Sequence, residues 1–285
     1  MIYALCATVM NGLFWIAQKI ESESKMNRDG FIFYLHLGMI IIPLLLWVSG
    51  YTTLIFDVYV LLLAMFINGV YVYVLKLRLK CLEYMTSSTY FINYRVFIAI
   101  FLLVLGQVIF QESISLNEYV GIAVGFVIFY LLIEKKNNTI DALANLKTGY
   151  VLLAISIILG GVIWLCHKYI SYQDFSISTY VLYSGIIGAI LPLIFRWNHT
   201  VKQTLICRWW RHISFVFFTA VIFSAGFYLN MVALIEGWDV WVVYKIISYG
   251  LIFPILFSII YYKEPVTWKK LLAFILTIAS IALFI

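Results

Sequence analysis

Two basic residues lie inside long apolar segments, where a charge is costly. Arg95 belongs to residues 84–106 and Lys245 to residues 238–261, and each follows a tyrosine. A charge at the centre of a bilayer costs roughly 2.5–3.5 kcal/mol on insertion scales. None of the thirteen acidic residues falls clearly in mid-membrane, so both cations need counter-charge from water, carbonyls or a ligand. A guanidinium binds phosphate or carboxylate as a fork and an ammonium binds it as a point charge, so the pair predicts an anion clamp.

A structural role for the same side chains stays open. Both cations can satisfy carbonyls between packed helices, and Lys245, about seven residues into its segment, can extend its ammonium to the membrane surface. Nearby rings can stack on a solute or face lipid, and amides can line a cavity or tie helices together. The candidate solute-binding residues are Arg95, Lys245, Tyr94, Tyr244, Tyr90, Trp241, Asn11, Trp15, Asn68 and Asn93.

The composition requires a membrane. Of 285 residues, 65% are hydrophobic and only 11% are charged, and the mean hydropathy is +1.03. Soluble domains carry about 25% charged residues. We therefore predict an all-α integral membrane protein with no soluble domain. Its ten transmembrane helices are expected in residues 2–20, 30–50, 57–76, 84–106, 117–135, 148–168, 174–196, 211–233, 238–261 and 267–285.

The basic residues predict an orientation. Sixteen of the nineteen fall in the connections after the first, third, fifth, seventh and ninth segments, Lys19 and Arg78 among them, and only Lys168 falls on the other side. Because cytoplasmic loops are enriched in Lys and Arg, both termini are expected outside the cytoplasm. The chain is then a multi-pass protein of the cell membrane. The net charge of +6 resides in these short loops, so no nucleic-acid partner is expected.

The two halves of the chain repeat. Residues 11–19, NGLFWIAQK, align with residues 160–168, GGVIWLCHK, at an offset of 149. Residues 111–129 align with residues 263–281 at an offset of 152, which places Glu112 on Glu264. Five helices are an odd number, so the second half must insert upside down. We predict two inverted five-helix repeats, residues 1–140 and 141–285, an architecture typical of transporters with a site near the midplane.

This pattern resembles the drug/metabolite transporter superfamily, in its EamA-like ten-helix branch. The resemblance covers the whole chain and rests on the acidic turns ESIS at residues 112–115 and EPVT at residues 264–267, and on Trp15 in the first helix. The chain departs from the family pattern in having no basic residue in residues 50–57 and no basic tail. The resemblance implies a secondary transporter without cofactor. It also implies anion recognition, since sugar-phosphate and nucleotide-sugar relatives carry basic residues on the helices that match those of Arg95 and Lys245.

We therefore predict a secondary transporter that moves a small polar metabolite carrying an anionic group by alternating access. Its partners are the solute and the bilayer. Amino acids or quaternary amines are the alternative solutes, although the first helix carries Asn11 and no acid, and a flippase for lipid-linked solutes shares the basic site. No nucleotide motif or metal-ligand spacing appears, so no enzyme, metal or cofactor is expected. Gly121 and Gly125 form a GxxxG pattern that fits packing within the chain or a dimer, so we expect a monomer or a homodimer.

Overall fold

A computed structural model describes residues 2–24, 28–110, 116–132, 140–171, 175–206, 210–235, 240–264 and 266–283. All regular elements in these residues are helices. They are α1 (Ile2–Ser24), α2 (Arg28–Met39), α3 (Ile41–Val48), α4 (Val58–Tyr84), α5 (Ser87–Phe110), α6 (Leu116–Leu131), α7 (Ile140–Ser171), α8 (Ile177–Ile206), α9 (Trp210–Ile235), α10 (Val240–Ser248), the 3-10 turn η1 (Tyr249–Leu251), α11 (Ile252–Tyr261) and α12 (Trp268–Leu283).

In the described residues these helices form ten apolar segments. α2 and α3 follow each other with a break at Ile40, and α10, η1 and α11 form one continuous segment. Six segments are each long and apolar enough to cross a membrane by themselves. In hydrocarbon every backbone N–H and C=O must be bonded within the segment, so apolar runs of this length fold as helices. The predicted all-α membrane fold is confirmed.

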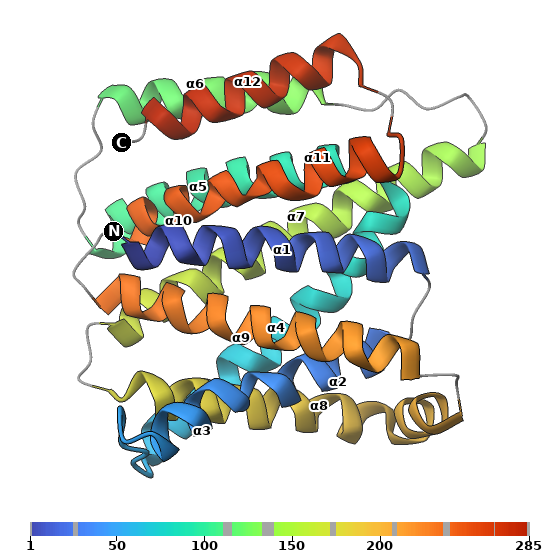
Figure 1. Ribbon diagram of the computed structural model, residues 1–285. Helices are drawn as coiled ribbons and strands as arrows, with labels where there is room; N and C mark the ends of the chain where they lie inside the picture. Colours follow the sequence, from blue (N-terminus) through green and yellow to red (C-terminus); the bar gives the residue numbers. More distant parts are fainter. Residues whose placement is uncertain are drawn as a thin grey trace.

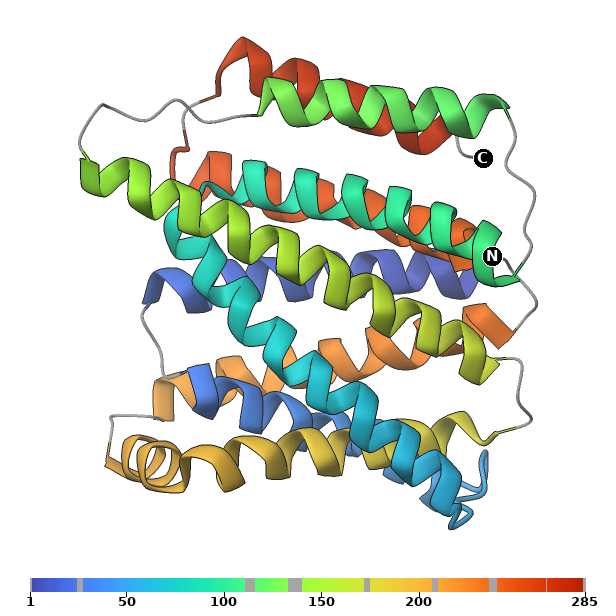
Figure 2. The same cartoon turned by 180° about the vertical axis from the view of Figure 1, so that it is seen from behind.

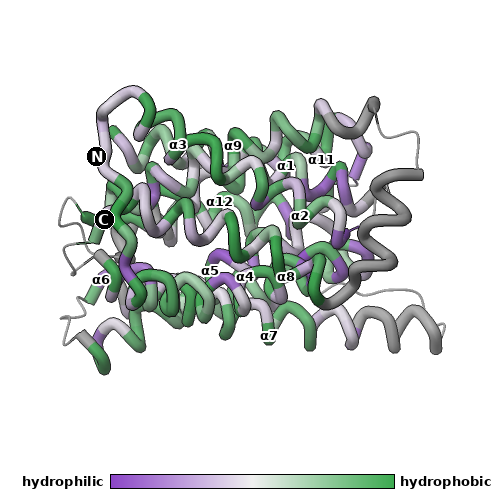
Figure 3. Tube along the Cα trace, turned by 90° about the horizontal axis from the view of Figure 1, so that it is seen from below, coloured by the Kyte–Doolittle hydropathy of each residue, from purple (hydrophilic) through white to green (hydrophobic). Residues whose placement is uncertain are grey.

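The helices lie side by side with their long axes across the view of Figure 1. α6 and α12 pack on each other at one edge, and α2, α3 and α8 lie at the opposite edge (Figures 1 and 2). α1, α4, α5, α7, α9 and the α10–α11 segment fill the space between them. Apolar residues predominate along most of the helices (Figure 3), and outward-facing Leu62, Phe66 and Phe218 are exposed, as the lipid-facing side of a membrane protein requires.

The packing has the two-fold pattern of an inverted repeat. α1 packs along α9, and its counterpart α7 packs along α4, while α2 packs on α8 and α6 on α12. α1 and α7 run in opposite directions, and so do α6 and α12 (Figure 1). α1 begins and α12 ends on the same side of the molecule. These helices are the ones that the sequence offsets relate to each other.

Two glycine–phenylalanine contacts repeat in the same way. A Cβ atom on Gly12 of α1 would lie 2.4 Å from the ring of Phe253, and one on Gly161 of α7 would lie 2.2 Å from the ring of Phe101. The glycines differ by the offset of 149 and the phenylalanines by 152, the two offsets found in the sequence. Each half therefore seats its first helix against a ring contributed by the other half. The boundary between the halves near residue 140 stays a prediction.

The GxxxG pattern of α6 packs inside the chain. A Cβ atom on Gly125 would lie 2.7 Å from Val96 Cγ1 on α5, and the hydroxyl of Ser280 on α12 donates to the carbonyl of Gly121 at 3.2 Å. Small residues let helix backbones approach closely in a bilayer. Of the two roles predicted for this pattern, the structure supports the intrachain one.

Candidate functional site

Arg95 is buried among aromatic rings contributed by three helices. Its guanidinium carbon lies 3.9 Å from the ring centroid of Trp15 on α1, 4.9 Å from that of Tyr244 on α10 and 5.9 Å from that of Tyr94 on α5. The residue is only 6% exposed. Trp15 and Tyr94 belong to the first half of the chain and Tyr244 to the second. The two halves therefore meet around this one charge.

A second guanidinium contacts Tyr94. The guanidinium carbon of Arg78, on α4, is 4.7 Å from the centroid of the Tyr94 ring, and its Nη2 donates to the Tyr94 hydroxyl at 2.6 Å. Its Nη1 reaches Gln18 Oε1 on α1 at 3.5 Å. Arg78 is as buried as Arg95. The Tyr94 ring therefore lies near two buried guanidinium groups.

Neither guanidinium pairs with a carboxylate in the part of the chain that the structure describes. The ion pairs found there are Lys19–Glu264, Arg28–Glu83 and Lys76–Asp29. Arg95 Nε, Arg95 Nη1 and Arg78 Nε also lack a hydrogen-bond partner among the described residues. Cation–π contacts contribute about 0.5–2 kcal/mol each, which offsets only part of the cost of burying a charge. The cluster therefore favours a negatively charged group.

Tyr90 and Asn93 complete this region of α5. The Tyr90 ring stacks on that of Tyr94 with centroids 5.5 Å apart, and both side chains are buried. Asn93 donates from Nδ2 to the carbonyl of Thr89 at 2.9 Å, and its Oδ1 has no partner among the described residues. The structure thus brings together five of the predicted site residues as ring or cation contacts: Arg95, Tyr94, Tyr90, Tyr244 and Trp15.

Two other predicted site residues, Asn11 and Asn68, make hydrogen bonds to helices, and two more have side chains outside the described part of the structure. Asn11 donates from Nδ2 to Asn230 Oδ1 at 3.2 Å, which ties α1 to α9. Asn68 donates to the carbonyl of Ala64 at 2.8 Å within its own helix. The backbone of Trp241 and Lys245 belongs to α10, but their side chains lie outside the described part of the structure. Their roles stay predictions.

Comparison with known proteins adds the family. Residues 147–285, from within α7 to the end of the chain, match the model of the EamA-like transporter family. The chain is thus similar, over its second half, to EamA-like transporters. It is a multi-pass membrane transporter of the drug/metabolite transporter superfamily, as the acidic turns and Trp15 led us to expect.

A full-length likeness among solved structures agrees with this fold. A structure titled only as the crystal structure of a protein aligns with a TM-score of 0.66 at 11% identity, over 99% of this chain and 96% of that chain. At this identity the likeness shows the fold alone. No curated protein matches the sequence of this EamA-like transporter.

Two basic residues that the sequence placed in connections are buried inside helices of this transporter, so that assignment was wrong. α4 continues to Tyr84 rather than ending at residue 76, and Arg78 falls on its buried face. Buried Leu75, Arg78 and Leu82 follow each other at three- and four-residue spacing, the period of one helix face. Because Leu77, Leu79 and Cys81 of α4 are buried as well, this spacing alone would not have singled out Arg78. Lys19 is likewise within α1 and buried.

Lys19 joins the two halves of the transporter at the end where α1 terminates. Its Nζ lies 3.6 Å from Glu264 Oε1, and the backbone N–H of Ser87 donates to the same oxygen at 3.2 Å. Its ammonium also lies 5.5 Å from the centroid of the Tyr262 ring. Glu264 of the acidic turn therefore holds together the end of α1 and the start of α5. Its predicted counterpart Glu112 lies outside the described residues.

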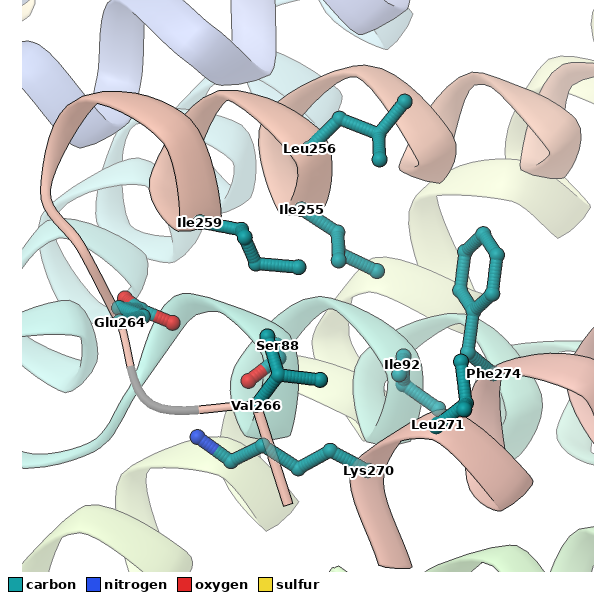
Figure 4. A pocket seen from close by; sticks show the side chains of 10 residues that line it. All are labelled: Ser88, Ile92, Ile255, Leu256, Ile259, Glu264, Val266, Lys270, Leu271 and Phe274. Carbon is teal, nitrogen blue, oxygen red and sulfur yellow. The ribbon is translucent and has the colours of Figure 1, made fainter. Parts of the chain in front are cut away.

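A cavity of about 110 Å³ lies between α5, α11 and α12 (Figure 4). Apolar side chains such as Ile92, Ile255 and Phe274 form most of its lining, with Glu264 and Lys270 among the lining residues. None of the predicted solute-binding residues contributes to it. The cavity is therefore suited to hydrocarbon rather than to a polar solute.

Proposed function

We propose that this transporter moves a small organic anion by alternating access, as a secondary transporter, and that Arg95 binds the anionic group. One observation carries the proposal: Arg95 is a buried guanidinium with two nitrogens that lack hydrogen-bond partners and no carboxylate beside it among the described residues. At an effective dielectric constant near 20, an anion about 4 Å away contributes on the order of 4 kcal/mol before desolvation. Lys245 of α10 remains the predicted second cation of the clamp.

Burial of the site supports alternating access. Arg95, Trp15, Tyr94 and Tyr244 are each less than one-tenth exposed, so a solute reaches them only when helices separate. α1 and α5 belong to the first half and α10 to the second, and inverted halves that rock against each other open such a site to one side at a time. The Lys19–Glu264 contact joins the same two halves. We propose that it separates when the end where α1 terminates opens.

A quaternary amine is the second candidate solute, because aromatic rings gather at the site. Rings such as those of Trp15 and Tyr244 can hold a choline-like cation. Here, however, the Arg95 guanidinium already lies over both rings. A second cation would meet like charge in a low-dielectric environment. The geometry therefore favours an anion, whether the solute is free or lipid-linked.

A ligand screen on the purified transporter in detergent tests this choice. A solute that binds only the folded state raises the melting temperature with its concentration. We expect glucose 6-phosphate, succinate or related anions to raise it, and choline to leave it unchanged. Uptake of the stabilising anion into proteoliposomes would then establish transport. Stabilisation by choline alone would contradict the proposal and favour an aromatic cage.

The orientation in the cell membrane is a further part of the proposal. Exposed Lys80 and Lys269 lie at the ends of α4 and α12 nearest the end of α1, whereas exposed Tyr51 follows α3. The positive-inside rule then puts Lys269 in the cytoplasm and both termini outside. With Cys6 replaced by alanine, Tyr51→Cys should react with an impermeant maleimide in intact cells and Lys269→Cys should not. The reverse labelling pattern would show the opposite orientation.

A further inference from the structure

We infer that Arg78 and Arg95 form one site for a small organic oxyanion with two negative charges, a phosphate monoester or a dicarboxylate. The inference rests on the proposed function, which requires only a single anionic group at Arg95. It adds a second cation, from α4, and it specifies the charge of the solute.

Tyr94 holds the two guanidiniums on a single ring. Arg78 contacts it through a hydrogen bond to the hydroxyl and over the ring face, and Arg95 lies toward the same ring at 5.9 Å. A Cβ atom on Gly160 of α7 would lie 2.5 Å from the Tyr94 hydroxyl oxygen. The hydroxyl is therefore fixed between α4 and α7. This fixes the position of the Arg78 guanidinium against Tyr94, the ring that Arg95 also approaches.

Three guanidinium nitrogens without hydrogen-bond partners among the described residues are available as donors to a ligand with several oxygens. Arg78 Nε, Arg95 Nε and Arg95 Nη1 are buried donors that bond to nothing in the described residues. Phosphate and carboxylate groups accept from guanidinium N–H groups through paired oxygens. Buried donors in native proteins nearly always have a partner. A bound oxyanion would supply acceptors to donors of this kind.

The charge of the cluster specifies the charge of the ligand. Arg78 and Arg95 are both at least nine-tenths buried, and neither pairs with a carboxylate among the described residues. A monoanion would leave one buried positive charge without compensation, and a dianion would neutralise both. Because uncompensated buried charge is costly, the site should bind a dianion more tightly than a monoanion of similar size and shape.

Arg78 also has a structural contact, to Gln18 on α1, so the test must separate the two roles. A purely structural Arg78 would change the affinity for every ligand alike when it is replaced. A ligand-binding Arg78 would change the affinity for dianions and spare monoanions. The ratio of the two affinities is therefore the decisive measurement.

The experiment compares matched ligands on the purified full chain by ligand-dependent melting shifts. Phenyl phosphate is paired with its methyl diester, and succinate with its monoamide, at about pH 7.5, above the second phosphate pKa of about 6. We expect wild type to prefer the dianion of at least one pair by about tenfold or more. Arg78→Gln should reduce that ratio to near one and leave the monoanion affinity unchanged. Lys80→Gln, a change of an exposed lysine on the same helix, should preserve the ratio.

The outcomes distinguish this inference from the proposed function. Equal affinities of wild type for both members of both pairs would overturn the dianion site, even if Arg78→Gln did not fold. A preserved ratio in folded Arg78→Gln would overturn it as well, whereas the proposed function would stand if Arg95→Gln still abolished anion binding. Failure of wild type to bind any of the four anions would overturn the proposed function itself. Preference within one pair alone would identify the solute as a phosphate monoester or a dicarboxylate.

Discussion

Replacement of Arg95 by glutamine is expected to weaken anion binding about 100-fold or more, while the melting temperature of the ligand-free transporter stays the same or rises. A hundredfold loss equals about 2.8 kcal/mol, less than the roughly 4 kcal/mol attraction expected for a contact at about 4 Å. Stability should not fall, because Arg95 has no carboxylate partner among the described residues to be left unpaired. Removing a buried charge without a counter-ion relieves its desolvation cost.

The measurement is anion uptake into proteoliposomes together with melting of the ligand-free protein. Arg28→Gln is the matched control, since Arg28 is a partly exposed arginine that pairs with Glu83 at the end of a helix. The control should retain uptake. Unchanged uptake in Arg95→Gln would show that this guanidinium has a structural role. A large fall in melting temperature would mean that Arg95 stabilises the ligand-free helix packing.

Replacement of Gly250 by alanine is expected to destabilise the transporter by about 1–3 kcal/mol, the usual cost of overpacking. A Cβ atom there would lie 2.7 Å from the carbonyl oxygen of Thr8, 3.3 Å from the backbone nitrogen of Gly12 and 3.1 Å from the ring of Trp15. Two of these neighbours are backbone atoms of α1, which cannot rotate away as a side chain can. α1 must therefore shift away from η1, and Trp15 must move with it relative to Arg95.

Gly69→Ala is the control for this change, because nothing lies within 4 Å of a Cβ atom at Gly69 on α4. That substitution should be neutral or stabilise slightly, since glycine within a helix is less favourable than alanine by roughly 0.5–1 kcal/mol. Thermal melting of both variants in the same detergent gives the comparison. Equal melting temperatures would mean that α1 and η1 are less closely packed than the structure indicates. Reduced anion binding by Gly250→Ala would link this packing to the site.

The sequence by itself determined the fold class, because hydrocarbon permits few structures for apolar runs of this length. Residues 84–106 could only be a helix, and α5 spans Ser87–Phe110. The offsets of 149 and 152 relate α1 to α7 and α6 to α12, and the contacts of Gly12 with Phe253 and of Gly161 with Phe101 repeat at these offsets. The sequence made Arg95 a candidate because a charge within an apolar run has few structural explanations.

Only the tertiary structure decided which polar residues meet. Arg78 meets Tyr94 because α4 extends beyond the apolar run to Tyr84. The amide of Asn11 meets Asn230 on α9, and Lys19 meets Glu264 from the far end of the chain. The physical reason is that a helical period fixes which residues share a face, while the partner of that face depends on how all the helices pack.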